Sequence, residues 1–332
     1  MTDTTEFKAW RVEESDGEYV GSEQTLRVSD LPDNEVLIRV THSSLNYKDA
    51  LSASGNKGVT REFPHTPGID AAGEVVEASA GPLSAGDQVL VTGYDLGMNT
   101  DGGFGEFIRV PAAWCVPMPA GWDARKAMIY GTAGLTAGLC VKKLLAMGAA
   151  PEQGRVVVSG ASGAVGSVAV EILAGLGFEV VAVSGKAEHA DSLKKLGASE
   201  VLGRETFEST KKPMLKPVFA NGIDTVGGGP LAEMLKQILP GGSVSCCGLV
   251  AGPQLETTVL PFILRGNNLL GVDSVEIPLA EKQIVWSRLA GEWACPQTEA
   301  SARDIGRSEL QSALNAFLKG QSSGKIVLDH SR

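Results

Sequence analysis

The sequence has few residues suited to holding a metal ion or a nucleic acid. A structural zinc site needs about four Cys or His ligands at short spacing. The cysteines form no C-x-x-C pair and no group with histidine; they are Cys115, Cys140, Cys246, Cys247 and Cys295. Long basic runs are also missing, and the net charge is −10, from 29 basic and 39 acidic residues. We therefore expect no metal site and no binding to nucleic acid or an anionic membrane.

Long apolar segments and export signals are missing as well. No apolar run approaches the roughly 20 residues that cross a bilayer. The N-terminal stretch MTDTTEFKAW lacks the basic and apolar regions of a signal peptide. An odd number of cysteines without an export signal fits a reducing compartment. These absences predict a cytoplasmic protein with free thiols.

Aromatic residues are scarce, at 5% of the chain, whereas glycine is abundant, at 41 of 332 residues. With 43% hydrophobic residues the chain can bury large cores, and its length suggests two domains. This composition favours an α/β protein with many tight turns.

The first 127 residues are rich in predicted strands. Apolar and polar residues alternate over residues 36–40, as in a half-buried strand. Short runs follow at GIDAAGEVVEA, GDQVLVTG and GGFGEFIRVP, separated by Gly, Pro and Asp. Such short strands with turn signals predict a compact, barrel-like domain.

From about residue 128, strands and helices alternate. A helix is predicted in GTAGLTAGLCVKKLLAMG, then a strand in RVVVSG, a helix in AVGSVAVEILAGLG and a strand in EVVAVSG. The alternation continues to NLLGVDSV, which predicts a doubly wound parallel sheet. The last sixty residues contain one clear helix, ELQSALNAFLKG, and a closing strand, KIVLDH.

A glycine loop joins the strand at 156–158 to the following helix. Its pattern is A-x-G-x-x-G, with Ala161 where a first glycine is usual. Gly163 would let the backbone approach a pyrophosphate, and Gly166 would let the helix pack close to the strand. The helix N-terminus supplies amide donors to the phosphates. Because the motif lies between a strand and a helix, we favour dinucleotide binding over a turn with only a packing role.

The next strand, at 180–183, lacks the acid that usually ends it. In NAD-binding units that acid accepts hydrogen bonds from the ribose 2′-hydroxyl, and it would repel a 2′-phosphate. Here Ser184, Gly185 and Lys186 follow, and a hydroxyl, an open amide and a cation suit phosphate. Arg204 follows the next strand as a second cation. The pattern favours NADPH over the alternative that Lys186 is an ordinary surface lysine.

Those residues, with SSLNYKDAL, PGIDAAGEV and PFILRGNNLLGVDSV, resemble the medium-chain dehydrogenase/reductase superfamily and its zinc-free quinone-oxidoreductase-like group. The stretches RKAMIYGTAGLTAGLCV, DTVGGGPLAEML and GVDSV are similar to the acrylyl-CoA reductase branch. The resemblance implies a GroES-like catalytic domain at 1–127, completed by 273–332, and a Rossmann NADPH-binding domain at 128–272. We also expect a homodimer. Zinc-dependent relatives have Cys and His ligands where this chain has Ser44-Leu45-Asn46-Tyr47 and Pro67-Gly68-Ile69-Asp70.

Tyr47 and Asn46 lie where superfamily members place catalytic groups. We expect Tyr47 to line the nicotinamide site and to be a candidate proton donor, unless it is only a packing aromatic. Asn46 would orient substrate or cofactor, whereas Asp49 would cap the following helix. Further cofactor contacts implied by the resemblance are Thr132, Ser162, Gly163, Ala164, Val165, Gly320, and, in loops after Rossmann strands, Leu249, Ile263 and Ser274. The four histidines form no constellation in the sequence and are expected mostly at the surface or in loops.

The implied activity is NADPH-dependent reduction of the 2,3 double bond of acrylyl-CoA to propanoyl-CoA. Hydride transfer to the β-carbon would be followed by protonation of the α-carbon. Reduction of a quinone or small enone uses the same chemistry, and the sequence separates the two poorly. A non-catalytic NADPH-binding structural or redox-sensing protein is a third alternative, which the Asn46-Tyr47 pair disfavours. Candidate cations for the phosphates of a CoA substrate are Arg265, Lys282, Arg288 and Lys325.

Overall fold

A computed structural model describes residues 4–322 and 324–332. The chain forms two compact units. Unit 1 comprises Met1–Thr132, Ser274–Ala290 and Ser301–Arg332, and unit 2 comprises Ala133–Asp273 and Gly291–Ala300. Within the described residues, no helix combines the length and apolarity needed to span a bilayer.

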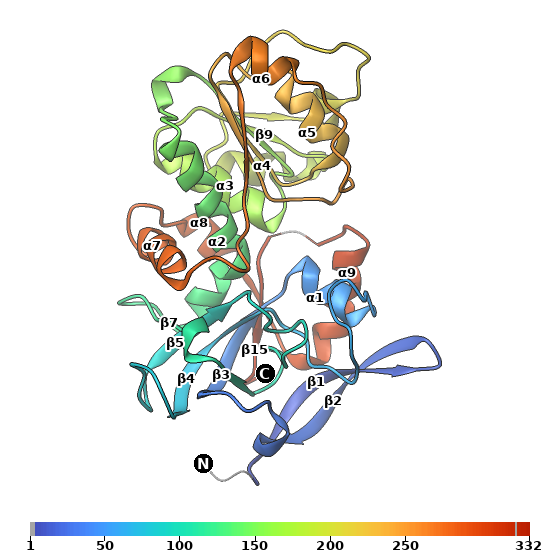
Figure 1. Cartoon of the computed structure of the whole chain (residues 1–332), viewed down its shortest axis with the longest axis vertical. Coiled ribbons are helices and arrows are strands. Elements are labelled where there is room, and N and C mark those ends of the chain that lie inside the picture. Colours follow the sequence, from blue (N-terminus) through green and yellow to red (C-terminus); the bar gives the residue numbers. More distant parts are fainter. Residues whose placement is uncertain (1–3, 323) are drawn as a thin grey trace. The chain divides into compact units, whose positions relative to one another are not determined.

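Unit 1 is built around a seven-stranded sheet in the order β14-β15-β3-β4-β5-β7, with β6 paired to β3 (Figure 1). Neighbouring strands are antiparallel, except for the parallel pair of β14 and β15. The strands are β3 (Val36–Ser44), β4 (Asp70–Ala78), β5 (Gln88–Thr92), β6 (Phe107–Val110), β7 (Val116–Pro117), β14 (Arg303–Ile305) and β15 (Ile326–Asp329). The strands predicted in the first 127 residues are therefore present.

Strand β3 is buried on both faces at its start. Val36 and Ile38 pack into one core with Val75, whereas Leu37 packs on the other side with Phe7. A strand covered on both faces tolerates consecutive apolar residues, which explains why the predicted alternation is incomplete there.

An N-terminal hairpin was not predicted. It consists of β1 (Glu6–Ser15) and β2 (Glu18–Arg27), paired antiparallel along their full length. Its turn residues, Asp16 and Gly17, have φ angles of 53° and 82°. Positive φ at both positions is typical of an Asp-Gly hairpin turn. The polar composition of β2, which has no buried residue, hides the strand from a hydrophobicity pattern.

The helices of unit 1 include α1 (Tyr47–Ala53) and α9 (Leu310–Leu318), which lie side by side and share a core with Leu45 (Figure 1). The prediction of one helix in the last sixty residues was wrong, because α7 (Leu279–Leu289) and α8 (Pro296–Ser301) are also present. The inward face of α7 includes a buried lysine, Lys282, beside Val285 and Trp286. That buried cation interrupts the apolar pattern by which a helix is recognised.

Unit 2 contains a six-stranded parallel sheet in the order β10-β9-β8-β11-β12-β13, with helices on both sides (Figure 1). This is the doubly wound order of a Rossmann fold, and the prediction is confirmed. The strands are β8 (Val156–Ser159), β9 (Val180–Val183), β10 (Glu200–Leu202), β11 (Asn221–Asp224), β12 (Ser243–Cys246) and β13 (Asn268–Gly271). The helices include α3 (Ala164–Gly175), α4 (Ala190–Lys195), α5 (Gly228–Leu235) and α6 (Leu260–Arg265).

Helix α2 (Ala124–Ala146) is bent at Gly131, whose φ of 50° and ψ of −156° are not helical. The predicted helix over 131–148 is thus the part that follows this bend, and Gly148 closes it with a φ of 82°. Short 3₁₀ helices complete the chain: η1 (Val28–Asp30), η2 (Ala112–Trp114), η3 (Pro151–Gln153), η4 (Ala187–His189), η5 (Arg204–Phe207) and η6 (Arg307–Glu309).

Candidate functional site

Asp70, at the start of β4, is the centre of a buried polar cluster in unit 1. Its carboxylate accepts hydrogen bonds from the Ser44 hydroxyl, from Asn46 Nδ2 at 2.9 Å, and from the Thr132 N–H and hydroxyl at 2.8 and 2.6 Å. The Asp70 side chain is fully buried. Two residues expected to face the cofactor, Asn46 and Thr132, are therefore held by one carboxylate.

Helix α1 places Asn46 and Tyr47 at the end of β3. Asn46 is the N-cap of α1, and Tyr47 is its first residue, with 41% of its surface exposed. Asp49 was expected to cap the helix but lies inside it as its third residue; its carboxylate accepts the Asn46 N–H at 2.7 Å and the Ile69 N–H at 2.8 Å. Burial and the neighbouring charge of Asp70 raise the pKa of Asp49 to about 7.

The bend of α2 allows Thr132 to reach Asp70. A β-carbon on Gly131 would lie 2.3 Å from Ser44 Oγ and 2.6 Å from Asp70 Oδ2. Only glycine leaves room for the cluster and also adopts this backbone conformation without strain.

A buried cation lies near the same cluster. Lys325 is 3% exposed, and its Nζ donates a hydrogen bond to the Tyr130 carbonyl at 2.9 Å. Burial lowers its pKa to about 8, whereas the negative charge of Asp70 opposes that shift. Asp70 and Ser44 were not predicted as site residues, although an aspartate among small apolar residues in GIDAAG is itself a sign of a buried, bonded carboxylate.

The glycine loop of unit 2, the predicted pyrophosphate site, connects β8 to α3. Gly163 is the N-cap of α3, and Ala164 and Val165 begin the helix. A β-carbon on Gly166 would lie 2.4 Å from the Gly160 carbonyl oxygen, so the helix starts in close contact with the turn after β8. This is the packing role expected of the last glycine of the motif.

The predicted phosphate residues of unit 2 come together after β9 and β10. The Ser184 hydroxyl donates to Ser162 Oγ at 2.9 Å and accepts from the Lys186 N–H at 3.1 Å. Arg204 begins η5 and lies over Gly185, because a β-carbon on Gly185 would be 1.7 Å from Arg204 Nε. The loop after β8, the end of β9 and the end of β10 thus lie close together. Lys186 follows β9, and Arg204 follows β10.

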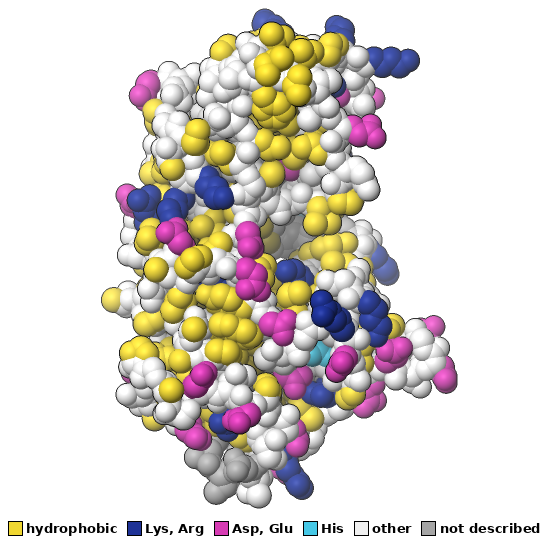
Figure 2. Space-filling model, in the orientation of Figure 1, with side chains coloured by type: hydrophobic (Ala, Val, Ile, Leu, Met, Phe, Trp, Pro, Cys, Tyr) yellow, Lys and Arg dark blue, Asp and Glu magenta, His cyan; other side chains and the backbone are white. Residues whose placement is uncertain are grey.

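The remaining predicted cofactor contacts are scattered. Leu249 follows β12, Ser274 follows β13, and Gly320 follows α9. Ile263 was placed wrongly, because it lies within α6, before β13, and not in a loop after a strand. Leu249 and Ile263 are 61% and 69% exposed, and Figure 2 shows hydrophobic side chains gathered over the part of unit 2 that carries α6.

Three of the four cations considered for CoA phosphates are engaged inside the protein, so that suggestion was wrong for them. Arg265 donates to the carbonyls of Lys236, Ile238 and Leu215. Lys282 is buried and donates to two carbonyls at 2.6 and 3.0 Å, and Lys325 is bound as described. Such cations hold the chain together and are not presented to a ligand.

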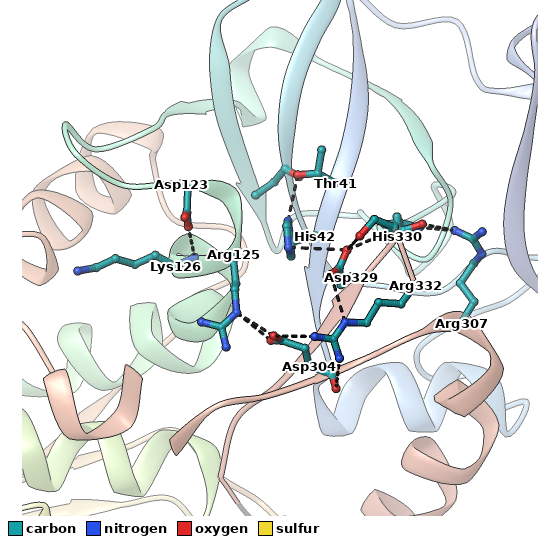
Figure 3. Close-up of polar contacts among 12 residues, drawn as sticks. Thr41, His42, Asp123, Arg125, Lys126, Asp304, Arg307, Asp329, His330 and Arg332 are labelled. Atoms are coloured by element: carbon teal, nitrogen blue, oxygen red, sulfur yellow. Dashed lines mark hydrogen bonds and ion pairs between the residues drawn. The ribbon is translucent and has the colours of Figure 1, made fainter. Parts of the chain in front are cut away.

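Two histidines of unit 1 that are distant in the sequence, His42 and His330, contact charged side chains, which their spacing did not predict. Figure 3 shows His42 beside Asp329, at 4.0 Å, and His330 joined to Arg307. His330 Nε2 donates to the Gly103 carbonyl at 2.9 Å, so its Nδ1 accepts from Arg307 at 3.1 Å. Burial, with the Arg307 charge, lowers the pKa of His330 to about 4. In the same view, Arg125 and Arg332 pair with Asp304.

His65 is also buried, 3.7 Å from Asp101, and like His330 it lies outside the named helices and strands, so most histidines are in loops or at the surface, as expected. No group of three or more His, Cys, Asp or Glu side chains within residues 4–322 and 324–332 is arranged to hold a metal ion. At the zinc-ligand stretches of related enzymes, Ser44 is bonded to Asp70 and Ile69 is apolar and buried, so the residues do not fit a zinc ion.

Two family profiles match the chain. The family described as alcohol dehydrogenase GroES-like domain matches residues 32–120, and the family described as zinc-binding dehydrogenase matches residues 164–290. The fold class predicted from the sequence, a GroES-like β-rich domain with a Rossmann domain, is confirmed.

Relatives of known name match over nearly the whole chain. The probable acrylyl-CoA reductase AcuI of Escherichia coli is 46% identical over 97% of this chain and 99% of its own. The putative quinone oxidoreductase YhfP of Bacillus subtilis is 41% identical over 98% and 99%, and a crystal structure of yhfP with NAD bound has a TM-score of 0.95 over 98% of this chain and 100% of that one. The yhdH oxidoreductase of Salmonella enterica, solved in complex with NADP, is 43% identical, with a TM-score of 0.95 over 97% and 99%.

Proposed function

Because the chain belongs to the medium-chain dehydrogenase/reductase superfamily, in the group of acrylyl-CoA reductases and quinone oxidoreductases, we propose that it reduces acrylyl-CoA to propanoyl-CoA with NADPH. The observation that carries the proposal is the full-length identity of 46% with a probable acrylyl-CoA reductase. The family resemblance predicted from the sequence is confirmed, and the protein is an oxidoreductase.

The phosphate residues of unit 2 support NADPH as the cofactor. Relatives of similar identity were solved with NADP and with NAD, so the choice between these cofactors is argued from the residues of this chain. Lys186 and Arg204 bring two positive charges to the strand ends where an NAD-binding unit has a carboxylate. The open glycine between them, Gly185, leaves room for the Arg204 side chain. A 2′-phosphate matches this arrangement.

For this reaction the protein mainly has to position the cofactor and the substrate and to stabilise the charge that develops. Bound NADPH supplies the hydride that adds to the β-carbon of the thioester. Negative charge then develops on the thioester oxygen, and a proton must reach the α-carbon. Tyr47 provides a partly exposed phenol for that purpose, whereas Asn46 and Thr132 position the reactants.

Quinone or small enone reduction is the second candidate, favoured by the 41% identity with a putative quinone oxidoreductase. It needs the same hydride but no site for the phosphates of CoA. The internal bonding of Arg265, Lys282 and Lys325 leaves the CoA phosphates without an assigned partner. The non-catalytic alternative has no support from the comparisons.

Side-by-side rates decide between the two substrates. NADPH oxidation is followed at 340 nm with acrylyl-CoA, crotonyl-CoA and a simple benzoquinone at equal concentrations. We expect the highest kcat/KM with acrylyl-CoA, and propanoyl-CoA as its product. A higher kcat/KM with the quinone would replace the proposed substrate by the second candidate.

A further inference from the structure

We propose that Asp70 is a positioning residue that orients Asn46 and Thr132 as hydrogen-bond acceptors toward the nicotinamide riboside half of the cofactor. The inference rests on the proposed function, because it assumes a nicotinamide cofactor. It deepens that function by assigning a role to a buried carboxylate that touches neither substrate nor cofactor.

The direction of each hydrogen bond follows from the charge of Asp70. A carboxylate offers only acceptors, so every group it contacts must present a proton. The Thr132 hydroxyl has a single proton, and that proton points to Asp70 Oδ1 at 2.6 Å. In any further hydrogen bond the Thr132 oxygen must therefore accept.

The Asn46 amide is fixed in the same way. Its Nδ2 lies 2.9 Å from Asp70 Oδ2 and 3.3 to 3.4 Å from the hydroxyl and carbonyl of Ser44. The opposite orientation would bring two oxygens together without a proton between them. The amide nitrogen is thus committed to the interior, and Oδ1 is the acceptor that Asn46 presents.

Two acceptors match the donors of a nicotinamide riboside, which carries ribose hydroxyls and a carboxamide N–H group. They do not match the oxygen of a reduced thioester, which needs donors. Of the three site residues Asn46, Tyr47 and Thr132, only the Tyr47 hydroxyl keeps a proton to offer to the substrate. Asn46 and Thr132 therefore bind the cofactor, and Tyr47 donates the proton.

Lys325 and Ser44 complement the negative charge of the Asp70 carboxylate. The buried ammonium of Lys325 interacts electrostatically with Asp70, and charge-assisted donors surround the carboxylate. A neutral amide at position 70 would present its own N–H groups. Those would pair with Asn46 Oδ1 and release the Thr132 proton to point elsewhere.

The test compares the binding of two ligands to the full chain by calorimetry. NADPH contains the nicotinamide riboside, whereas adenosine 2′,5′-bisphosphate contains only the adenosine half. We expect Asp70→Asn to weaken NADPH binding at least about tenfold, the equivalent of one to two lost hydrogen bonds, and to leave adenosine 2′,5′-bisphosphate binding within about twofold. Adding Asn46→Ala to Asp70→Asn should then cost little more.

The matched control is Asp101→Asn, which removes another largely buried carboxylate of unit 1, one that accepts from the Arg11 guanidinium and the Thr66 N–H. It should lower stability and leave the ratio of the two dissociation constants unchanged. If Asp70→Asn does not fold, Thr132→Ser should retain NADPH affinity and Thr132→Val should lose it about tenfold.

Two results would overturn the inference: an Asp70→Asn protein, or a Thr132→Val protein in its place, that binds NADPH like the wild type, or one that loses both ligands equally. Either would reduce Asp70 to a structural role. The proposed function fails separately, because then the wild-type protein itself would not bind NADPH or would not reduce acrylyl-CoA.

Discussion

Tyr47 is the residue on which the proposed proton transfer depends. It is the only phenol in SSLNYKDAL, and hydroxyls of serine are far too weak as acids to replace it. We expect Tyr47→Phe to lower the turnover of acrylyl-CoA about 10²-fold, the usual size of general acid catalysis, without loss of the fold. Steady-state kinetics with circular dichroism measures both.

The control is Tyr19→Phe, a half-buried tyrosine of the N-terminal hairpin, which should leave turnover unchanged. A few-fold loss seen mainly in NADPH affinity would assign Tyr47 to the wall of the site. An unchanged rate and affinity would make it a packing residue and leave solvent as the proton source.

Lys186 and Arg204 are the proposed determinants of the choice of cofactor. We expect the wild-type protein to prefer NADPH over NADH at least about tenfold, since a charge-assisted contact to phosphate contributes on the order of 1.5–3 kcal/mol. Lys186→Asp should erode or reverse that preference, because it restores the acid of NAD-binding units. The ratio of kcat/KM for the two cofactors is the measurement.

Lys195→Asp changes the charge of unit 2 by the same amount on the exposed side of α4. It should leave the cofactor ratio within about twofold, because salt screens the charge of an exposed side chain. Equal kcat/KM values for NADPH and NADH in the wild type would contradict the assignment of these cations.

At the scale of elements, the bend in α2 is the most sensitive point of unit 1. A side chain at Gly131 would meet Ser44 and Asp70 and would also force a φ of 50° and a ψ of −156° on a residue with a β-carbon. We expect Gly131→Ala to lower the free energy of unfolding by about 3 kcal/mol or more, from steric overlap and strain together. Urea unfolding measures it.

Gly148→Ala is the matched control on the same helix. Its φ of 82° is also unfavourable for alanine, but no atom lies within 4 Å of the added β-carbon. It should cost only about 1–2 kcal/mol. Equal losses for the two variants would show that strain alone, and not the cluster around Asp70, makes Gly131 sensitive.

Elements with a strong local signal were predictable, and those that depend on distant contacts were not. The strands of the parallel sheet are short apolar runs between turn residues, so composition alone marks them. Helix α7 was missed because Lys282 faces inward, where its ammonium group donates to the carbonyl of Thr92, which is distant in the sequence. The hairpin β1–β2 was missed although its Asp-Gly turn is a recognisable signal.

The same division applies to the candidate site. The proposed phosphate residues of unit 2 could be predicted from the spacing within one nucleotide-binding motif. The contacts of Asp70 with Asn46 and Thr132 join three segments separated by many residues, which no local pattern predicts. The one sequence signal for these contacts was the aspartate among small apolar residues in GIDAAG.

For the molecule as a whole, His330 makes stability depend on pH. Its pKa is about 4 in the folded state, because burial and Arg307 disfavour the imidazolium, and about 6.5 when unfolded. The unfolded state therefore binds more protons between these values, and folding stability falls as pH drops from 6.5 through 4. We expect this group to contribute at most about 3 kcal/mol to that loss.

His330→Gln should flatten the dependence, because glutamine still donates to the Gly103 carbonyl but does not titrate. Unfolding by urea at pH 7.0, 5.5 and 4.5 gives the comparison, and His189→Gln, on η4 of unit 2, is the control. Parallel curves for wild type and His330→Gln would assign acid sensitivity to other groups.

Activity of the molecule should require no metal ion. In zinc-dependent relatives Cys and His bind the ion, whereas here Ser44 and Ile69 stand in the corresponding stretches. We expect less than about 0.1 equivalent of zinc in the purified protein by elemental analysis and full activity after dialysis against a chelator. Stoichiometric zinc together with activity lost to the chelator would contradict this.

The sheet of unit 1 also sets the order in which the protein is completed during synthesis. Residues 42–44 of β3, which lead into Asn46 and Tyr47, pair with β15, whose first residue is Ile326. At about 5–20 residues per second, a ribosome needs roughly 15–60 s to travel from one to the other. The six strands of unit 2 are all made within that interval. The parallel sheet can therefore form on the nascent chain, whereas the end of β3 that precedes the proposed proton donor waits for β15, which is translated after that sheet.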